Sequence, residues 1–167
     1  MSVRTPEAAD RGYGTVEAAA EQPRREFLTC RLGEEPYGID ILRVREIRKV
    51  EGITRVPHVA PYVRGVINLR GAIVPIVDLG LMFGFAEPLA LEAASVIVLN
   101  AERRLVGLAV TSVSDVIALA DDEIVPAPDL GQRAIDAAVS GIGTVDGTSV
   151  LLLDVDHLLG RIRGGAL

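Results

Sequence analysis

The segment Gly65–Leu79 reads GVINLRGAIVPIVDL. Apolar runs stand on both sides of Asn68–Gly71, and they predict two strands joined by a tight turn, because Asn and Gly tolerate the backbone angles that such turns require. Asp78 follows the second run, where its carboxylate can accept hydrogen bonds from the free amides of a first helical turn. The segment therefore predicts a hairpin followed directly by a short, capped helix.

This pattern recurs 76 positions later in the chain. The matched pairs are Gly65 with Gly141, Gly71 with Gly147, Asp78 with Asp154 and Gly84 with Gly160. Further upstream, a shift of 69 positions lays Phe27–Cys30 over Val96–Leu99 and Val44–Ile47 over Val113–Val116. The two shifts imply one insertion of seven residues within the stretch 117–140. Self-similarity at fixed offsets indicates a duplicated unit, so we predict two similar halves.

The 167 residues suffice for one domain or for two small, closely packed ones. Hydrophobic residues make up 49% of the chain and aromatic residues only 4%, so the core must be mainly aliphatic. The net charge of −6 and the pI near 4.9 argue against nucleic acid as a partner, since that binding requires a basic face. The basic run Arg43–Lys49 is interrupted by Glu46 and is interpreted as a solvated face.

The single cysteine, Cys30, excludes an internal disulfide and a thiolate metal site. It alternates with other residues in a predicted strand, so we expect a small, buried, apolar side chain. No apolar run approaches the ~18 residues of a membrane-spanning helix, and no signal-peptide pattern is present. We therefore expect a soluble, cytoplasmic protein without direct membrane insertion.

Residues 1–25 lack periodic hydrophobic residues, which predicts a flexible N-terminal tail. From Phe27 onward, short alternating runs separated by Gly and Pro predict successive strands and hairpins, one strand being Val50–Val56. In the second half, Asp154 is expected to cap a last helix that ends at Gly160. Many short strands with Gly and Pro turns are typical of small barrels.

No combination of residues predicts catalysis, a cofactor or a metal site. His58 and His157 are the two histidines, and no Gly-x-Ser-x-Gly motif supports a hydrolase triad. Gly141–Gly143 lacks the strand–helix context and the lysine of a phosphate-binding loop, and Asp121–Glu123 lacks the ligand spacing of a calcium loop. The lack of such a site favours a binding module.

Candidate binding residues are Arg64, Arg70, Glu46 and the corresponding pair Val44 and Val113. Arg70 stands at the tip of the predicted hairpin, where a solvated turn residue is the alternative interpretation. For Glu46 the alternative is a surface ion pair, which contributes under ~1 kcal/mol.

The same residues carry a family resemblance. The matching blocks, in order, are Tyr37–Leu42, Val44–Arg48, Gly65–Gly71, Ile73–Leu79 and Val113–Val116. From about Glu26 to Leu159, the chain resembles the CheW family of bacterial chemotaxis coupling proteins. The resemblance implies a mainly β fold of two intimately packed five-stranded SH3-like β-barrels with short helices. We expect a single domain over 26–160, with the first barrel at about 26–93 and the second at about 94–160, followed by a short tail at 161–167.

The resemblance further implies a non-enzymatic adaptor without cofactors. It would bridge the cytoplasmic tips of chemoreceptors to the regulatory domain of the histidine kinase CheA, at membrane-associated receptor arrays. The family's receptor-binding positions correspond to Val44, Gly65, Val113 and Val116. The charged pair important for coupling corresponds to Glu46 and Arg70. A second kinase contact, which helps close rings of kinase and adaptor, corresponds to Val125, Asp129 and Leu130.

The chain departs from the family pattern at a few positions. Thr111 and Gly80 stand where the family often has an aspartate and an arginine, and Val125 and Leu130 replace a basic and an aromatic residue. These differences bear on the set of partners. The alternatives are a module of another chemosensory pathway, such as surface motility, or a detached regulatory fragment of a kinase or a receiver-linked relative. A small hydrolase is the alternative from another class, and the missing catalytic site argues against it.

Overall fold

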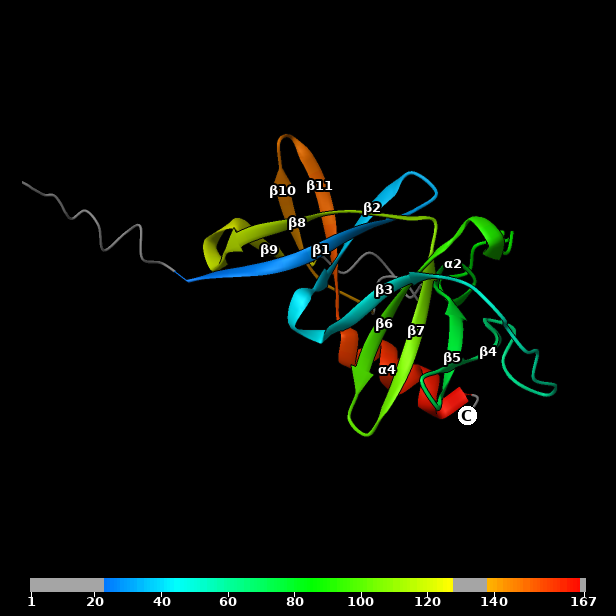
Figure 1. Cartoon of the computed structure of the whole chain (residues 1–167). Coiled ribbons are helices and arrows are strands. Elements are labelled where there is room, and N and C mark those ends of the chain that lie inside the picture. Colours follow the sequence, from blue (N-terminus) through cyan, green and yellow to red (C-terminus); the bar gives the residue numbers. More distant parts are fainter. Residues whose placement is uncertain (1–22, 128–137, 166–167) are drawn as a thin grey trace, which may run out of the picture.

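In the computed structural model, which describes residues 23–127 and 138–165, the chain forms two β-sheets with short helices between and beside them (Figure 1). One sheet has six strands and the other has five. The prediction of a mainly β fold with short helices is therefore confirmed. None of the helices in the described ranges is both long and apolar enough to cross a bilayer.

The five-stranded sheet has the strand order β3-β6-β7-β5-β4. Its strands are β3 (Val44–Lys49), β4 (Val63–Leu69), β5 (Ala72–Asp78), β6 (Ser95–Ala101) and β7 (Arg104–Val110). Neighbouring strands are antiparallel except for β5 and β7, which are parallel.

The six-stranded sheet has the order β8-β1-β2-β11-β10-β9. Its strands are β1 (Arg24–Leu32), β2 (Glu35–Asp40), β8 (Ser112–Ala120), β9 (Ile124–Pro126), β10 (Val139–Val145) and β11 (Thr148–Leu153). The short helices are η1 (Ile41–Arg43), α2 (Leu79–Met82), η2 (Leu91–Ala93), η3 (Asp121–Glu123) and α4 (Val155–Gly165).

The strand registers of the two sheets repeat one another. Val44 of β3 lies opposite Leu99 of β6, and its counterpart Val113 of β8 lies opposite Cys30 of β1. The parallel pairs agree as well, with Ile76 opposite Gly107 and Leu152 opposite Gly38. All of these partners are related by the sequence shifts of 69 and 76, so the predicted internal duplication is confirmed at the level of individual residue pairs.

The two halves exchange hairpins. The first hairpin, β1–β2, belongs to the six-stranded sheet with the strands of the second half, and β6–β7 lies between β3 and β5 of the first half (Figure 1). The predicted division into barrels at 26–93 and 94–160 is therefore wrong. The two hairpins carry the same apolar pattern, so pattern alone does not distinguish pairing within a half from pairing between halves.

The sixth strand, β9, has a reduced counterpart in the other sheet. β9 pairs with β10 through Val125 and Ile142, whereas Thr54 forms an isolated bridge with Val66, the counterpart of Ile142. The predicted strand Val50–Val56 is consequently wrong, since only this bridge forms there and the strand lies earlier, in β3. Gly52 interrupts this segment, and Pro57 and Pro61 follow it, which explains why the bridge does not extend into a strand.

The largest hydrophobic cluster lies between the two sheets, and we call it the shared core. It draws Leu28 and Tyr37 from the six-stranded sheet, Ile97 and Leu108 from the five-stranded sheet, and the inner side of α4. Each sheet also has an inner cluster of its own. Cys30 is fully buried in the shared core, where burial raises the pKa of its thiol to about 12, so it is the inert apolar residue that was predicted.

Both predicted tails need correction. Strand β1 begins at Arg24, so the last residues of the stretch 1–25 are ordered, while residues 1–22 lie outside the described range. Helix α4 continues past Gly160 to Gly165, whereas a helix end and a tail at 161–167 were expected. The helix continues because Leu158, Leu159 and Ile162 form a buried stripe at helical spacing, which outweighs the low helix propensity of one glycine.

Candidate functional site

Strand β3 directs its two faces to different clusters. Directly opposed residues of an antiparallel pair project from the same face of the sheet. Val44 is opposite Leu99, a member of the shared core, whereas Glu46 is opposite Val98, a member of the inner cluster of the five-stranded sheet. A register shift between Val44 and Glu46 separates the two faces within a few residues.

Strand β8 repeats this arrangement on the six-stranded sheet. Val113 lies opposite Cys30 and Val116 lies opposite Leu28, and both partners belong to the shared core. Val44 and Val113 are half-buried against that core, and Val116 remains 49% exposed. Three of the four predicted receptor-binding residues therefore lie on sheet faces that turn toward one common core, at its exposed margin.

Gly65, the fourth of these residues, is buried within β4. Its φ of 148° favours glycine, and a Cβ at this position would stand 2.4 Å from the carbonyl oxygen of Thr54 and 2.9 Å from Cγ1 of Ile53. Any side chain here would displace the segment that Thr54 anchors through its bridge to Val66. Gly65 thus fixes a loop position and offers no side chain to a partner.

Glu46 and Arg70 contact one another in the structure. The Arg70 guanidinium donates to Oε2 of Glu46, linking the tip of the β4–β5 hairpin to the edge strand β3. The tip has positive φ angles at Arg70 (52°) and Gly71 (91°), and the amide of Gly71 donates to Oδ1 of Asn68 at 2.9 Å. The predicted turn at Asn68–Gly71 is confirmed, and it directs Arg70 back toward β3.

A third residue, Arg48, joins this pair. Nη1 of Arg48 lies 3.6 Å from Oε1 of Glu46, so the carboxylate has a cation at each oxygen. The hydrogen bond from Arg70, helped by the nearby positive charges, holds the pKa of Glu46 below its usual value. The spacing of Glu46 and Arg48 on one strand face is the signal that would have identified Arg48. The counterparts of Glu46 and Arg70 in the second half are Asp115 and Asp146, so the duplication does not repeat the ion pair.

Arg64 has a structural partner. Its Nη1 donates to Oδ2 of Asp78 at 2.9 Å and to the carbonyl of Leu89 at 3.0 Å. Asp78 is fully buried, and it also accepts from the amides of Leu81 at 3.0 Å and Leu89 at 2.9 Å. The predicted helix cap is confirmed, and Arg64 serves to neutralise the buried carboxylate, which removes it as a free binding group.

Val125 is the described member of the predicted ring contact. It lies on the edge strand β9 and is 60% exposed. Asp129 and Leu130 fall in the stretch 128–137, outside the described residues.

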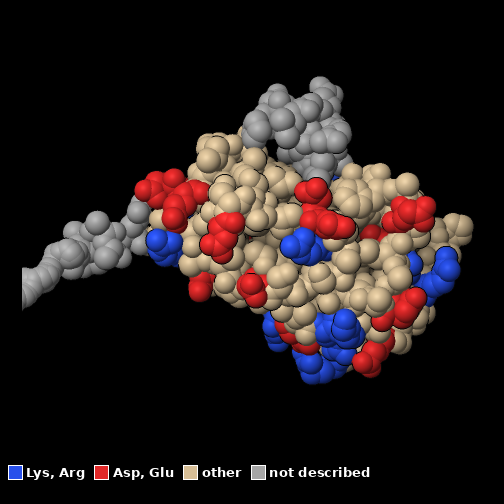
Figure 2. Space-filling view, turned by 90° about the horizontal axis from the view of Figure 1, so that it is seen from above, with Lys and Arg blue, Asp and Glu red and all other residues tan. Residues whose placement is uncertain are grey.

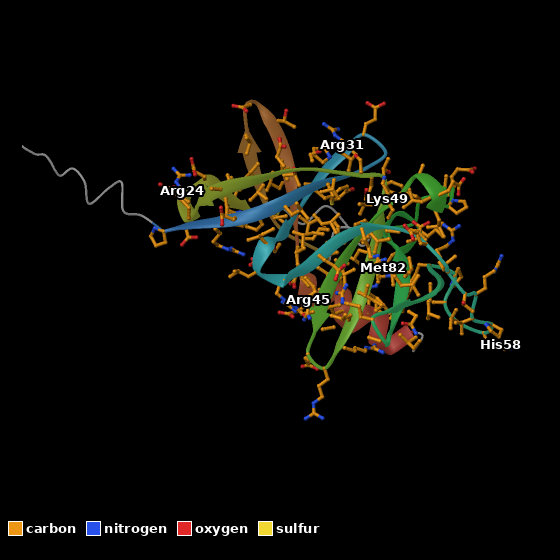
Figure 3. The ribbon with its side chains drawn as sticks, viewed as in Figure 1. Arg24, Arg31, Arg45, Lys49, His58 and Met82 are labelled. Atoms are coloured by element: carbon orange, nitrogen blue, oxygen red, sulfur yellow. The ribbon has the colours of Figure 1, made fainter. Side chains whose placement is uncertain are left out.

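The surface exposes large apolar side chains that a protein partner can contact. Large apolar side chains exposed on it are Leu42, Ile47, Ile73, Phe85, Val116 and Val125. Lys and Arg side chains gather along one side of the molecule among acidic ones (Figure 2), and Figure 3 shows Arg45 and Lys49 at the two ends of β3. Within the described ranges no group of three or more His, Cys, Asp or Glu side chains is arranged to hold a metal ion. His58 lies at the tip of the loop between β3 and β4 (Figure 3).

Comparisons with known proteins agree on one family. The model for the CheW-like domain matches residues 26–163. The chain is 41% identical to the chemotaxis protein CheW of Klebsiella aerogenes over 149 residues, covering 89% of this chain and 90% of the relative. It is 37% identical to the chemotaxis protein CheW of Rhizobium meliloti over 136 residues, covering 80% and 86%. The crystal structure of the scaffolding protein TtCheW from Thermoanaerobacter tengcongensis superposes with a TM-score of 0.77 at 30% identity, covering 87% of this chain and 98% of that one.

Proposed function

The chain belongs to the CheW-like domain family of non-enzymatic chemotaxis scaffolds, and we propose that it couples the cytoplasmic tips of chemoreceptors to the regulatory domain of the histidine kinase CheA. In this role it works in the cytoplasm at membrane-associated receptor arrays. It holds both partners at once through separate faces, and it acts by contact alone, without a cofactor.

The observation that carries this proposal is the common orientation of Val44, Val113 and Val116. Two of these valines come from one sheet and one from the other, yet all lie on faces directed toward the shared core. An aliphatic side chain that is 49% exposed, as Val116 is, contributes little to the fold and is available for burial by a partner. This margin is where the receptor tip docks.

The pair of Glu46 and Arg70 transmits the coupling. It joins the edge strand β3 to the β4–β5 hairpin tip, so it holds fixed the strand that carries Val44. Arg70 keeps 64% of its side chain exposed and therefore remains open to a partner while it is paired. Its link to β3 and its exposure both suit a residue whose contacts change when a receptor occupies the neighbouring surface.

The kinase is held at a different face. Val125 is an exposed apolar residue on β9, an edge strand that follows β8 through η3 and pairs with β10. Together with Asp129 and Leu130 it forms the ring contact. Each single contact is modest, and the array gains strength because many adaptors engage at the same time.

Binding assays with two purified partners test the proposal. A cytoplasmic fragment of a chemoreceptor and the isolated regulatory domain of CheA should each bind the wild-type chain, and the three should form a ternary complex. Val116→Asp should abolish receptor binding and leave kinase binding intact, because a charge on a buried contact face is costly.

Ile73→Asp is the matched control, since Ile73 is exposed (62%) and lies on β5, which β6 and β7 separate from β3 in the sheet order. It should leave both affinities unchanged. If the wild-type chain binds neither partner, the adaptor function is refuted. If receptor and kinase compete, the chain does not bridge them.

A further inference from the structure

The face of β3 that carries Val44 continues to Ile47 and Lys49. Ile47 lies opposite Ile97, which is fully buried in the shared core, so Ile47 projects from the same face as Val44. Ile47 is nevertheless 46% exposed. The fold therefore leaves about half of a large aliphatic side chain uncovered on a face that is otherwise directed toward the core.

The internal duplication allows the exposure of Ile47 to be compared with that of its counterpart in the second half. The counterpart of Ile47 is Val116, which lies opposite Leu28 of the shared core and is 49% exposed. The two residues have the same register, the same orientation and nearly the same exposure. The proposed receptor surface includes Val116 on β8 but ends at Val44 on β3. Adding Ile47, the counterpart of Val116, makes the two strands contribute equivalent residues.

The two sides of this surface differ in charge. Beyond Ile47 on the same face stands Lys49, and the position corresponding to Lys49 on β8 is Ala118. Arg45 at the register shift of β3 is likewise exposed, and its counterpart is Ser114. The β3 side is cationic at these positions, whereas β8 has no Lys or Arg and carries the exposed Asp115 beside Val116, so an occupant with a carboxylate at one end is bound in one orientation.

Building on the proposed function, we propose that Ile47 and Lys49 extend the receptor surface along β3. Ile47 receives an apolar side chain of the receptor tip, and Lys49, two residues further along the same face, receives an adjacent carboxylate. Ile47 supplies affinity by apolar burial, and the cationic side chains of β3 set the direction in which the receptor segment lies.

Calorimetric titration with the purified cytoplasmic fragment of a chemoreceptor tests this inference. Ile47→Ala should weaken receptor binding about tenfold, as truncating an aliphatic anchor of an interface does. Ile73→Ala removes the same atoms from an exposed isoleucine on β5, which two strands, β6 and β7, separate from β3 in the sheet order, and it should leave the affinity unchanged. Lys49→Glu should weaken binding most at low salt, because screening reduces the contribution of exposed charges.

The same variants are titrated with the regulatory domain of CheA, whose affinity should not change. If Ile47→Ala and Ile73→Ala bind the receptor fragment with equal affinity, the inference is overturned. The adaptor function still stands in that case, provided that the wild-type chain binds. A loss of kinase affinity alone in Ile47→Ala also overturns it, since the surface then belongs to the kinase. Failure of the wild-type chain to bind the receptor fragment refutes the adaptor function itself.

Discussion

Replacing Asp78 by alanine is expected to destabilise the protein far more than the same change at its counterpart Asp154. The Asp78 carboxylate is fully buried and accepts three hydrogen bonds, from Nη1 of Arg64 at 2.9 Å, from the amide of Leu81 at 3.0 Å and from the amide of Leu89 at 2.9 Å. Asp78→Ala leaves all three donors without this acceptor, and one of them is charged.

Removing one partner of a buried charged pair costs about 3–5 kcal/mol. Arg64 is 24% exposed and keeps its bond to the carbonyl of Leu89, so water and this carbonyl offset part of the loss. We therefore expect a loss near the lower limit, about 3 kcal/mol. Asp154 is exposed, and its side chain accepts one bond, from the amide of His157 at 3.0 Å, so Asp154→Ala should cost about 1 kcal/mol, as for other helix caps.

Urea-induced unfolding of the two variants measures the difference in their free energies of unfolding. An equal dependence of that free energy on urea concentration in both variants shows that the unfolded states are comparable. Thermal midpoints should follow in the same order, by about 2–4 °C per kcal/mol for a chain of this size. Equal losses in the two variants would show that the buried network around Asp78 adds nothing beyond a helix cap, and this would refute the structural role given to Arg64.

Three further outcomes are expected. Arg70→Glu should abolish coupling in a receptor-dependent kinase assay without lowering the melting temperature by many degrees, and adding Glu46→Arg should restore part of the coupling; a large drop in melting temperature would instead give Arg70 a structural role. Because the bond from Arg70 lowers the pKa of Glu46, this pair should add stability above the usual glutamate pKa of about 4.3 and lose it as pH falls through the lower folded-state pKa, so the stabilities of wild type and Glu46→Gln should converge in acid. Leu130→Ala should weaken ring closure with the kinase and spare receptor binding, and that contact should tolerate added salt, whereas its collapse between low and physiological ionic strength would show that Asp129 dominates it.

The sequence predicts those features of the fold that depend on local pattern. The turn at Asn68–Gly71, the cap at Asp78 and the repeat with Gly141–Asp154 follow from turn chemistry and spacing, and each is confirmed. The exchange of hairpins does not follow, because the two hairpins have equivalent patterns and only tertiary packing selects the partner. The same reason limits the prediction for Gly160, whose position in α4 depends on burial of Ile162 against strands that are distant in sequence.

The candidate site was predicted incompletely for a similar reason. Family resemblance identified the pair of Glu46 and Arg70, and the structure brings them together. It does not reveal that Arg48 contacts the second oxygen of Glu46, or that Arg64 is committed to a buried carboxylate. The Arg64 contact depends on how β4, β5 and the segment at Leu89 lie beside one another, which pattern along one strand does not show. Arg48 lies two residues from Glu46 on the same strand, so its contact could have been predicted from their spacing.

The reciprocal exchange of hairpins also determines how such a chain can assemble from one repeat. A single unit equivalent to β1–β5 and α2 lacks the hairpin that occupies the centre of its own sheet, between β3 and β5. It could complete that sheet only by receiving the hairpin of a second molecule and donating its own, as in a domain-swapped homodimer. The stability of that dimer would depend on protein concentration, whereas joining the two units in one chain makes the exchange intramolecular and removes this dependence. Joining the two units in one chain therefore keeps the exchange of hairpins complete at any protein concentration. It also allows the surface residues of each half to change independently.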